Sequence, residues 1–220
     1  MDKWLWLAAA VSLALSLTPW GELALYPFKL FTTWVHECGH AAMAVLVGGR
    51  VASITISPDT SGLTRSLVPA AALAQGLVAS AGYLGSSIVG CLLLRAARVP
   101  KRAKPILLTV GALMVITVVL WVRNLFGVVV VAAWAVFLIF VSRRATGKPL
   151  RFVLSLLAIQ VALNAVYDIR ALFFIRGQPT DAETMAQLFV LPSWFWATTW
   201  MALSVLLLLW TIGAVKFRRG

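Results

Sequence analysis

The sequence predicts an all-α membrane protein, a polytopic bundle of about six to seven transmembrane helices with a small β-hairpin after the second one. Two observations lead to this fold class. Of the 220 residues, 61% are hydrophobic, and the mean hydropathy of +0.94 is far above that of soluble domains. Apolar stretches of roughly 17 to 25 residues, the length that crosses a bilayer, recur along almost the whole chain. They leave no room for a soluble domain, so we expect one integral membrane domain over residues 1–220.

The apolar stretches define seven expected spans, at residues 4–20, 28–48, 69–95, 105–122, 125–142, 151–175 and 193–215. The first is interpreted as a retained membrane helix, because it lacks a clear small-residue cleavage site and continues into more hydrophobic sequence. Only Arg123 and Asn124, followed by Leu125 in "RNL", separate the fourth and fifth spans. These two either cross the membrane separately or form a tight hairpin that does not cross twice.

A small β-hairpin is predicted between the second and third spans. The β-branched residues Val51, Ile54, Thr55 and Ile56 precede the turn-forming segment "PDTSG", which predicts a strand, a turn and a returning strand at the membrane surface. The alternative is a plain polar connection, since isolated two-stranded hairpins are marginally stable.

The formal net charge of +12 comes from basic residues in short connections between apolar spans. Membrane topology and anionic lipid headgroups explain this placement, so nucleic-acid binding is not expected. If every span crosses, most basic residues share one face, which the positive-inside rule makes cytoplasmic, and the N-terminus is external. We expect a multi-pass protein in the plasma membrane of a prokaryote. The two cysteines, Cys38 and Cys91, show no spacing typical of disulfides or thiolate metal sites.

The motif "HECGH" places three ionisable side chains, His36, Glu37 and His40, within an apolar span. Histidines four residues apart project from one face of a helix, as binding of one tetrahedral zinc ion requires. Glu37 is then placed to take a proton from a water molecule on the metal, acting as catalytic base. Ionisable groups inside a membrane are costly unless they have partners, which favours a metal site over a pair of hydrogen-bonded structural histidines.

A catalytic zinc site needs a third protein ligand, and no third histidine exists. Asp168 is the predicted ligand because it lies inside an apolar span, on a stripe with Gln160 and Asn164 at spacings of four. The alternative for Asp168 is an ion pair with a neighbouring arginine. Asp181 is the second candidate ligand, if the segment "GQPTDAETMAQL" folds back into the bundle.

Three further features of the sequence are given roles. Asn164 either donates a hydrogen bond to a tetrahedral intermediate or the substrate, or joins helices. The residues Gly82, Ser86 and Gly90 form a strip of small side chains that predicts close helix packing. Tyr83 is interpreted as a core or interface aromatic, with transition-state donation as the alternative.

These motifs resemble the site-2 protease family of intramembrane zinc metalloproteases. The resemblance rests on "HECGH" in an early transmembrane helix, the hairpin after it, a glycine-rich helix and a late intramembrane aspartate. It is strongest to the compact branch without a PDZ domain, through "NAVYD" and "TDAETMAQL". It implies His36, His40 and Asp168 as zinc ligands, Glu37 as base, and membrane proteins as substrates. The chain departs from the family pattern where Ile169, instead of glycine, follows Asp168.

Three alternatives stay open from the sequence. The same ligands could form a non-proteolytic site for metal transport or sensing, with Glu37 relaying protons. The chain could also be an inactive scaffold for transmembrane partners. Finally, Glu183 could be the third ligand, as the downstream glutamate is in gluzincins.

Overall fold

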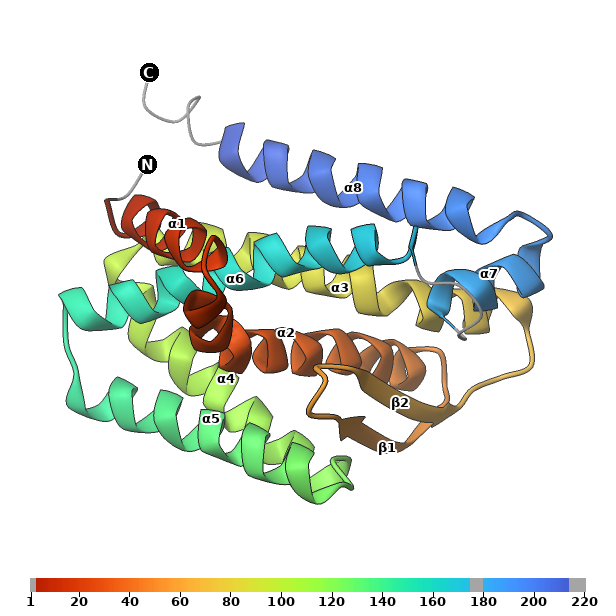
Figure 1. Cartoon of the computed structure of the whole chain (residues 1–220). Helices are drawn as coiled ribbons and strands as arrows, with labels where there is room; N and C mark the ends of the chain where they lie inside the picture. Colours follow the sequence, from red (N-terminus) through yellow and green to blue (C-terminus); the bar gives the residue numbers. More distant parts are fainter. Residues whose placement is uncertain (1–2, 175–179, 214–220) are drawn as a thin grey trace.

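The computed structural model describes residues 3–174 and 180–213, and it has the architecture predicted above, a helical bundle with one two-stranded hairpin (Figure 1). The elements are α1 (Lys3–Ser16), α2 (Pro19–Leu46), β1 (Arg50–Ile56), β2 (Gly62–Leu67), α3 (Ala72–Ala97), η1 (Pro100–Arg102), α4 (Ala103–Leu120), α5 (Leu125–Arg144), α6 (Lys148–Ala171), α7 (Asp181–Phe189) and α8 (Ser193–Gly213).

Five helices in the described residues, α3, α4, α5, α6 and α8, are long and apolar enough to cross a membrane. The protein is therefore an integral membrane protein. Both α4 and α5 belong to this set, which favours two separate crossings there over a shallow hairpin. The predicted sixth and seventh spans extend to residues 175 and 215, and these two ends lie outside the described residues.

The N-terminal region differs from the prediction. The expected first span is the 14-residue helix α1, which ends at Ser16, and α2 starts at Pro19, after Thr18 caps it by accepting a hydrogen bond from the Gly21 amide. At 1.5 Å per residue α1 measures about 21 Å, too short for a bilayer core of about 30 Å.

Helix α1 lies along α6 and runs in the same direction. The ring of Trp4 contacts that of Phe152 at 6.3 Å between centroids, and Ser12 accepts a hydrogen bond from Gln160 at 3.4 Å. α1 therefore begins at the end of the bundle where α6 begins, as Figure 1 shows. The prediction that Lys3 lies on or near the face opposite the basic connections is wrong, because it counted α1 as a complete crossing.

Helices α2, α3 and α6 pack closely through small residues. A Cβ on Gly39 of α2 would overlap the carbonyl of Ala81 in α3, and a Cβ on Gly90 would lie 3.0 Å from the Cα of Ala162 in α6. The predicted close approach along the α3 strip is thus confirmed. It brings α2 and α6 to the same region of α3.

The hairpin lies against α2 and is also held by the connection between α4 and α5. β1 and β2 are antiparallel, with Ile54 opposite Thr64 and a register shift between Val51 and Ser53. On the other side of β1, the amide of Ile54 donates to the carbonyl of Trp121 at 2.7 Å. The outer edge of β1 is therefore occupied, whereas β2 is the edge strand next to the cavity described below.

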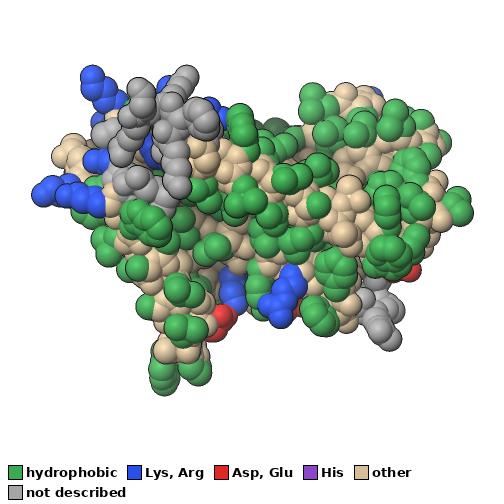
Figure 2. All heavy atoms as spheres, turned by 90° about the horizontal axis from the view of Figure 1, so that it is seen from above, with side chains coloured by type: hydrophobic (Ala, Val, Ile, Leu, Met, Phe, Trp, Pro, Cys, Tyr) green, Lys and Arg blue, Asp and Glu red, His purple; other side chains and the backbone are tan. Residues whose placement is uncertain are grey.

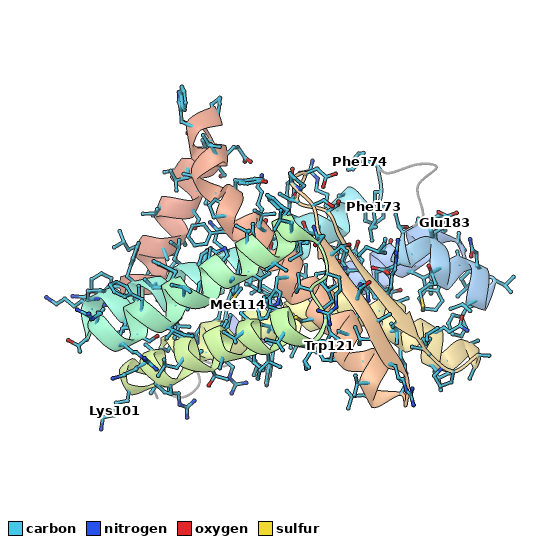
Figure 3. All side chains as sticks on the ribbon, turned by 90° about the horizontal axis from the view of Figure 1, so that it is seen from below. Lys101, Met114, Trp121, Phe173, Phe174 and Glu183 are labelled. Carbon is cyan, nitrogen blue, oxygen red and sulfur yellow. The ribbon has the colours of Figure 1, made fainter. Side chains whose placement is uncertain are left out.

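Lys and Arg side chains gather at one end of the bundle. Figure 2 shows a face dominated by hydrophobic side chains, with a group of Lys and Arg side chains at one end. The last turns of α3 and α5, the first turns of α4 and α6 and the connections between these helices carry many basic residues, among them Arg95, Arg98, Lys101, Lys104, Arg143, Arg144 and Lys148. Figure 3 shows Lys101 at one end and Glu183 of α7 at the other.

Candidate metal centre

Helix α2 and the start of α7 bring two imidazoles and one carboxylate together. His36 and His40 lie one turn apart on α2, with their Nε2 atoms 3.0 Å from each other. Asp181, the first residue of α7, places its Oδ2 atom 3.5 Å from Nε2 of His36 and 3.3 Å from Nε2 of His40. The predicted one-face arrangement of the two histidines is present, and a carboxylate more than 140 residues away completes a triangle of ligand atoms.

The size of this triangle fits a tetrahedral metal ion. Zinc binds nitrogen and oxygen at about 2.0–2.1 Å, so two ligand atoms of a regular tetrahedron lie about 3.3 Å apart. The three observed separations, 3.0, 3.3 and 3.5 Å, bracket that value. Two imidazoles and a carboxylate are also a ligand set that zinc accepts while leaving a fourth position open. The residues therefore fit the predicted ion.

His40 has a second hydrogen bond that prepares it to bind a metal. Its Nδ1 lies 2.7 Å from the carbonyl oxygen of Val78 in α3, so Nδ1 carries the proton and donates it. The lone pair of a neutral ring is then on Nε2, the atom that faces His36 and Asp181. A carbonyl partner of this kind fixes both the orientation and the tautomer of the ring.

His36 is held by aromatic contacts. The Tyr83 ring packs edge-on against His36 at 4.6 Å and stacks on Trp200 of α8 at 5.1 Å. Tyr83 thus packs as an aromatic between α2 and α8, and because it also lines the cavity described below, transition-state donation stays the alternative. Its neighbour Gly82 faces both imidazoles, and a Cβ at this position would overlap the Nε2 atoms of His36 and His40. The absence of a side chain at Gly82 leaves the space in front of the ligand atoms open.

Asp181 reaches the site because α7 folds back onto the bundle. Thr180 caps α7 by accepting a hydrogen bond from the Glu183 amide at 3.2 Å, and the buried residues Ala182 and Met185 pack α7 against the other helices. Burial by itself raises the pKa of Asp181, but hydrogen bonds with His36 and His40 and their charges outweigh it and hold that pKa well below its usual range. The carboxylate is therefore ionised, as a metal ligand must be.

Glu37 is 4% exposed and is held by the hairpin. Thr64 of β2 lies with its Oγ1 2.6 Å from Oε2 of Glu37 and 3.1 Å from the Glu37 carbonyl oxygen. A Cβ on Gly62 would overlap the Glu37 carboxylate, so the hairpin backbone approaches this side chain closely. Glu37 does not belong to the ligand triangle, and its role as base stays a prediction.

These side chains face one cavity of about 730 Å³. Its wall is built from α2, the hairpin, α3, the C-terminal end of α6 and α7, and it contains Asn164 and Asp168 as predicted. Gln160 is not in the wall; it is buried and donates to Ser12 of α1. The predicted stripe fails at this residue because each step of four residues rotates about 40° around a helix, which adds to about 80° between Gln160 and Asp168.

The two candidate aspartates occupy different positions in the cavity. Within residues 3–174 and 180–213, the group of three whose ligand atoms lie within 4.8 Å of one another is His36, His40 and Asp181, and Asp168 is outside it. Asp168 as zinc ligand stays a prediction. Glu183 also lies outside this group, and its side chain is exposed. Sequence reasoning missed Thr64 and the Val78 carbonyl, because no local pattern connects them with α2.

A comparison with protein families gives one match. The model of a family described as Peptidase M50B-like matches residues 6–211, nearly the whole chain and all of the residues that form the cavity. No curated protein and no solved structure matches the chain.

Proposed function

The chain belongs to the Peptidase M50B-like family, within the site-2 protease family of metallopeptidases, and from this premise we propose that it is an intramembrane zinc metalloprotease. Its proposed substrates are membrane proteins, cleaved within or near their transmembrane segments. The observation that carries the proposal is the triangle of His36, His40 and Asp181 beside the buried carboxylate of Glu37, in one cavity of a membrane-spanning bundle. We place it in the plasma membrane of a prokaryote.

For the zinc ligands we propose His36, His40 and Asp181. The sequence favoured Asp168 over Asp181, but the distances from Asp181 to both imidazoles support the second candidate. Asp168 faces the same cavity from α6, and it is the ligand to be preferred should substitution of Asp181 leave metal binding intact. A bound zinc ion supplies Lewis acidity, which polarises the scissile carbonyl and lowers the pKa of water toward about 7.

Glu37 acts as general base and then as general acid. Its carboxylate takes the proton from the attacking water and delivers it to the departing amine of the cleaved peptide bond. The buried position of Glu37 keeps this group at a fixed place beside the ligand triangle. Asn164, one turn before Asp168 in the cavity wall, is the proposed donor to the tetrahedral intermediate or the substrate backbone, with helix packing as the alternative.

A substrate helix must unwind before cleavage, because its own hydrogen bonds shelter the peptide bond. The edge strand β2 supports a solution, since residues 62–64 line the cavity and the other strand, β1, is already paired on both sides. An unwound segment that adds to β2 regains backbone hydrogen bonds and lies extended along the cavity.

Replacement of Glu37 by Gln tests the proposal. Purified Glu37→Gln protein should bind zinc at wild-type stoichiometry, whereas cleavage of co-expressed single-span membrane proteins should fall by about 10²- to 10⁴-fold, the usual contribution of a general base. Glu183→Gln is the matched control, because Glu183 is exposed outside the ligand group, and it should cleave normally.

The alternative of metal transport or sensing predicts a different result. A transport or sensing site that needs no general base keeps its activity in Glu37→Gln, and wild-type protein then yields no product that the variant lacks. Folded wild-type protein without near-stoichiometric zinc contradicts both functions and favours the scaffold.

A further inference from the structure

The hairpin touches the proposed base directly, and we infer that Thr64 is the positioning residue of Glu37. This inference rests on the proposed function. A threonine hydroxyl has one hydrogen to donate, and its two acceptors are the Oε2 and carbonyl oxygens of Glu37. The 2.6 Å contact to Oε2 is the shorter one and is charge-assisted, so the hydroxyl donates to the carboxylate. Oε1 is then the oxygen left to exchange a proton with water.

Thr64 also belongs to the strand edge that the substrate is proposed to use. The amide and carbonyl of Ile54 in β1 bond outward, to Trp121 and Arg123. Ile54 and Thr64 are opposite each other in the antiparallel ladder. Because Ile54 bonds outward, the two residues form a non-hydrogen-bonded pair, in which the backbone groups of both residues point away from the partner strand. The backbone amide and carbonyl of Thr64 therefore face the open edge of β2, while its side chain faces Glu37.

The hairpin is held in place on its other side by hydrogen bonds and buried side chains. Asn124, at the start of α5, uses its side-chain amide to donate to the Ile56 carbonyl at 2.7 Å and to accept from the Ile56 amide at 3.1 Å. Ile54 and Ile56 are fully buried on the face of β1 that packs against the helices. The strand that holds the base is thus fixed through β1 to the connection between α4 and α5.

It follows that one residue contacts both the extended substrate and the base. The backbone of Thr64 binds the substrate strand, and the hydroxyl of Thr64 orients Glu37 toward the peptide bond that this strand presents. The two functions are separable by mutation, because replacing the side chain leaves the backbone groups at this position in place.

The test is a kinetic comparison of Thr64→Val, Thr64→Ser and the matched control Thr55→Val in the full chain. The control removes a hydroxyl from β1 whose one described partner is the Leu63 carbonyl at 3.4 Å. Thr64→Val should lower kcat by about 10- to 100-fold, as is typical when the partner that orients a site residue is lost. KM and zinc content should stay unchanged, Thr64→Ser should recover most of the loss, and Thr55→Val should resemble wild type.

The outcomes separate this inference from the proposed function. If wild type cleaves, Glu37→Gln does not, and Thr64→Val keeps the wild-type kcat, Thr64 is not a positioning residue although the protein is a protease. The same conclusion follows if Thr64→Ser is as impaired as Thr64→Val, or if Thr64→Val loses activity only together with zinc or the folded state. If wild type and Glu37→Gln give identical products, the proposed function itself has failed.

Discussion

The helix pair α2–α3 and the helix pair α4–α5 are both antiparallel and rich in hydrophobic residues, yet they are built differently. α2 and α3 meet backbone to backbone at Gly39 against Ala81, and the backbone of Gly82 in α3 lies against the two imidazole side chains of α2. α4 and α5 meet through side chains, as where Gly111 faces Ile139. α2 carries buried polar groups, whereas the charged residues of α5 are confined to its last turn.

The difference shows how a membrane helix can carry chemistry. α2 is enclosed by α3, α5, α6 and the hairpin, and it is not among the helices apolar enough to count as candidate spans. α5 keeps large side chains such as Val136 and Phe140 exposed, as a lipid-facing helix does. Polar groups in a membrane require protein or metal partners. The α2–α3 pair, in which α2 is enclosed by other elements, is therefore the place where a metal site is possible. The α4–α5 pair contacts α2 through the Trp34–Thr117 hydrogen bond and contacts β1 through the connection between α4 and α5.

The largest expected effect is on zinc binding between α2 and α7. Asp181→Asn should lower zinc affinity by at least about 100-fold, since loss of a ligand exceeds the 10- to 100-fold effect of an outer partner, and cleavage should be lost. Asp168→Asn, the matched change in the same cavity, should keep zinc. Metal analysis of both purified variants decides which aspartate is the third zinc ligand. If Asp168→Asn loses zinc and Asp181→Asn keeps it, Asp168 is the ligand.

Gly82→Ala tests the close approach of the α3 backbone to the imidazoles of α2. The new Cβ would overlap both Nε2 atoms, so we expect zinc affinity and kcat to fall by about 10- to 100-fold. Gly111→Ala is the control in the α4–α5 pair, where the Cβ would lie 2.8 Å from a movable side-chain atom of Ile139. Equal effects of the two substitutions on zinc binding would contradict this difference between the α2–α3 and α4–α5 pairs.

Thr117→Val tests the link between the two pairs. Trp34 of α2 donates from Nε1 to Thr117 Oγ1 of α4 at 2.9 Å, and both residues are buried. Loss of the acceptor leaves this donor unpaired, and the free energy of unfolding should fall by about 1–3 kcal/mol. Activity per folded molecule should remain, because neither residue lines the cavity. Unfolding in detergent together with kinetics measures both quantities.

The smallest effect is expected on the lipid-facing side of α5. Val136 is 67% exposed, so Val136→Leu should change the free energy of unfolding by no more than about 0.5 kcal/mol and leave cleavage and zinc content unchanged. A clear loss of activity in this variant would mean that the outer surface of α5 takes part in function.

The sequence by itself determined the membrane class, most helices, the hairpin, and the histidine pair with its glutamate. Hydrophobic length and the spacing of four residues are local properties, and a helix places His36 and His40 on one face whatever surrounds it. Local properties also explain the errors. The short α1 was counted as a crossing because its apolar sequence continues into α2, and Gln160 was placed on the stripe because small rotations add up.

Only the tertiary structure decided which distant groups meet the imidazoles. Asp168 and Asp181 both lie far from α2 in the chain, and the fold-back of α7, driven by burial of Ala182 and Met185, brings Asp181 within 3.5 Å of the histidines. The contact of Thr64 with Glu37 likewise depends on how the hairpin docks on α2 and on the α4–α5 connection. Such contacts arise from packing between segments far apart in the chain, and no spacing within one segment encodes them.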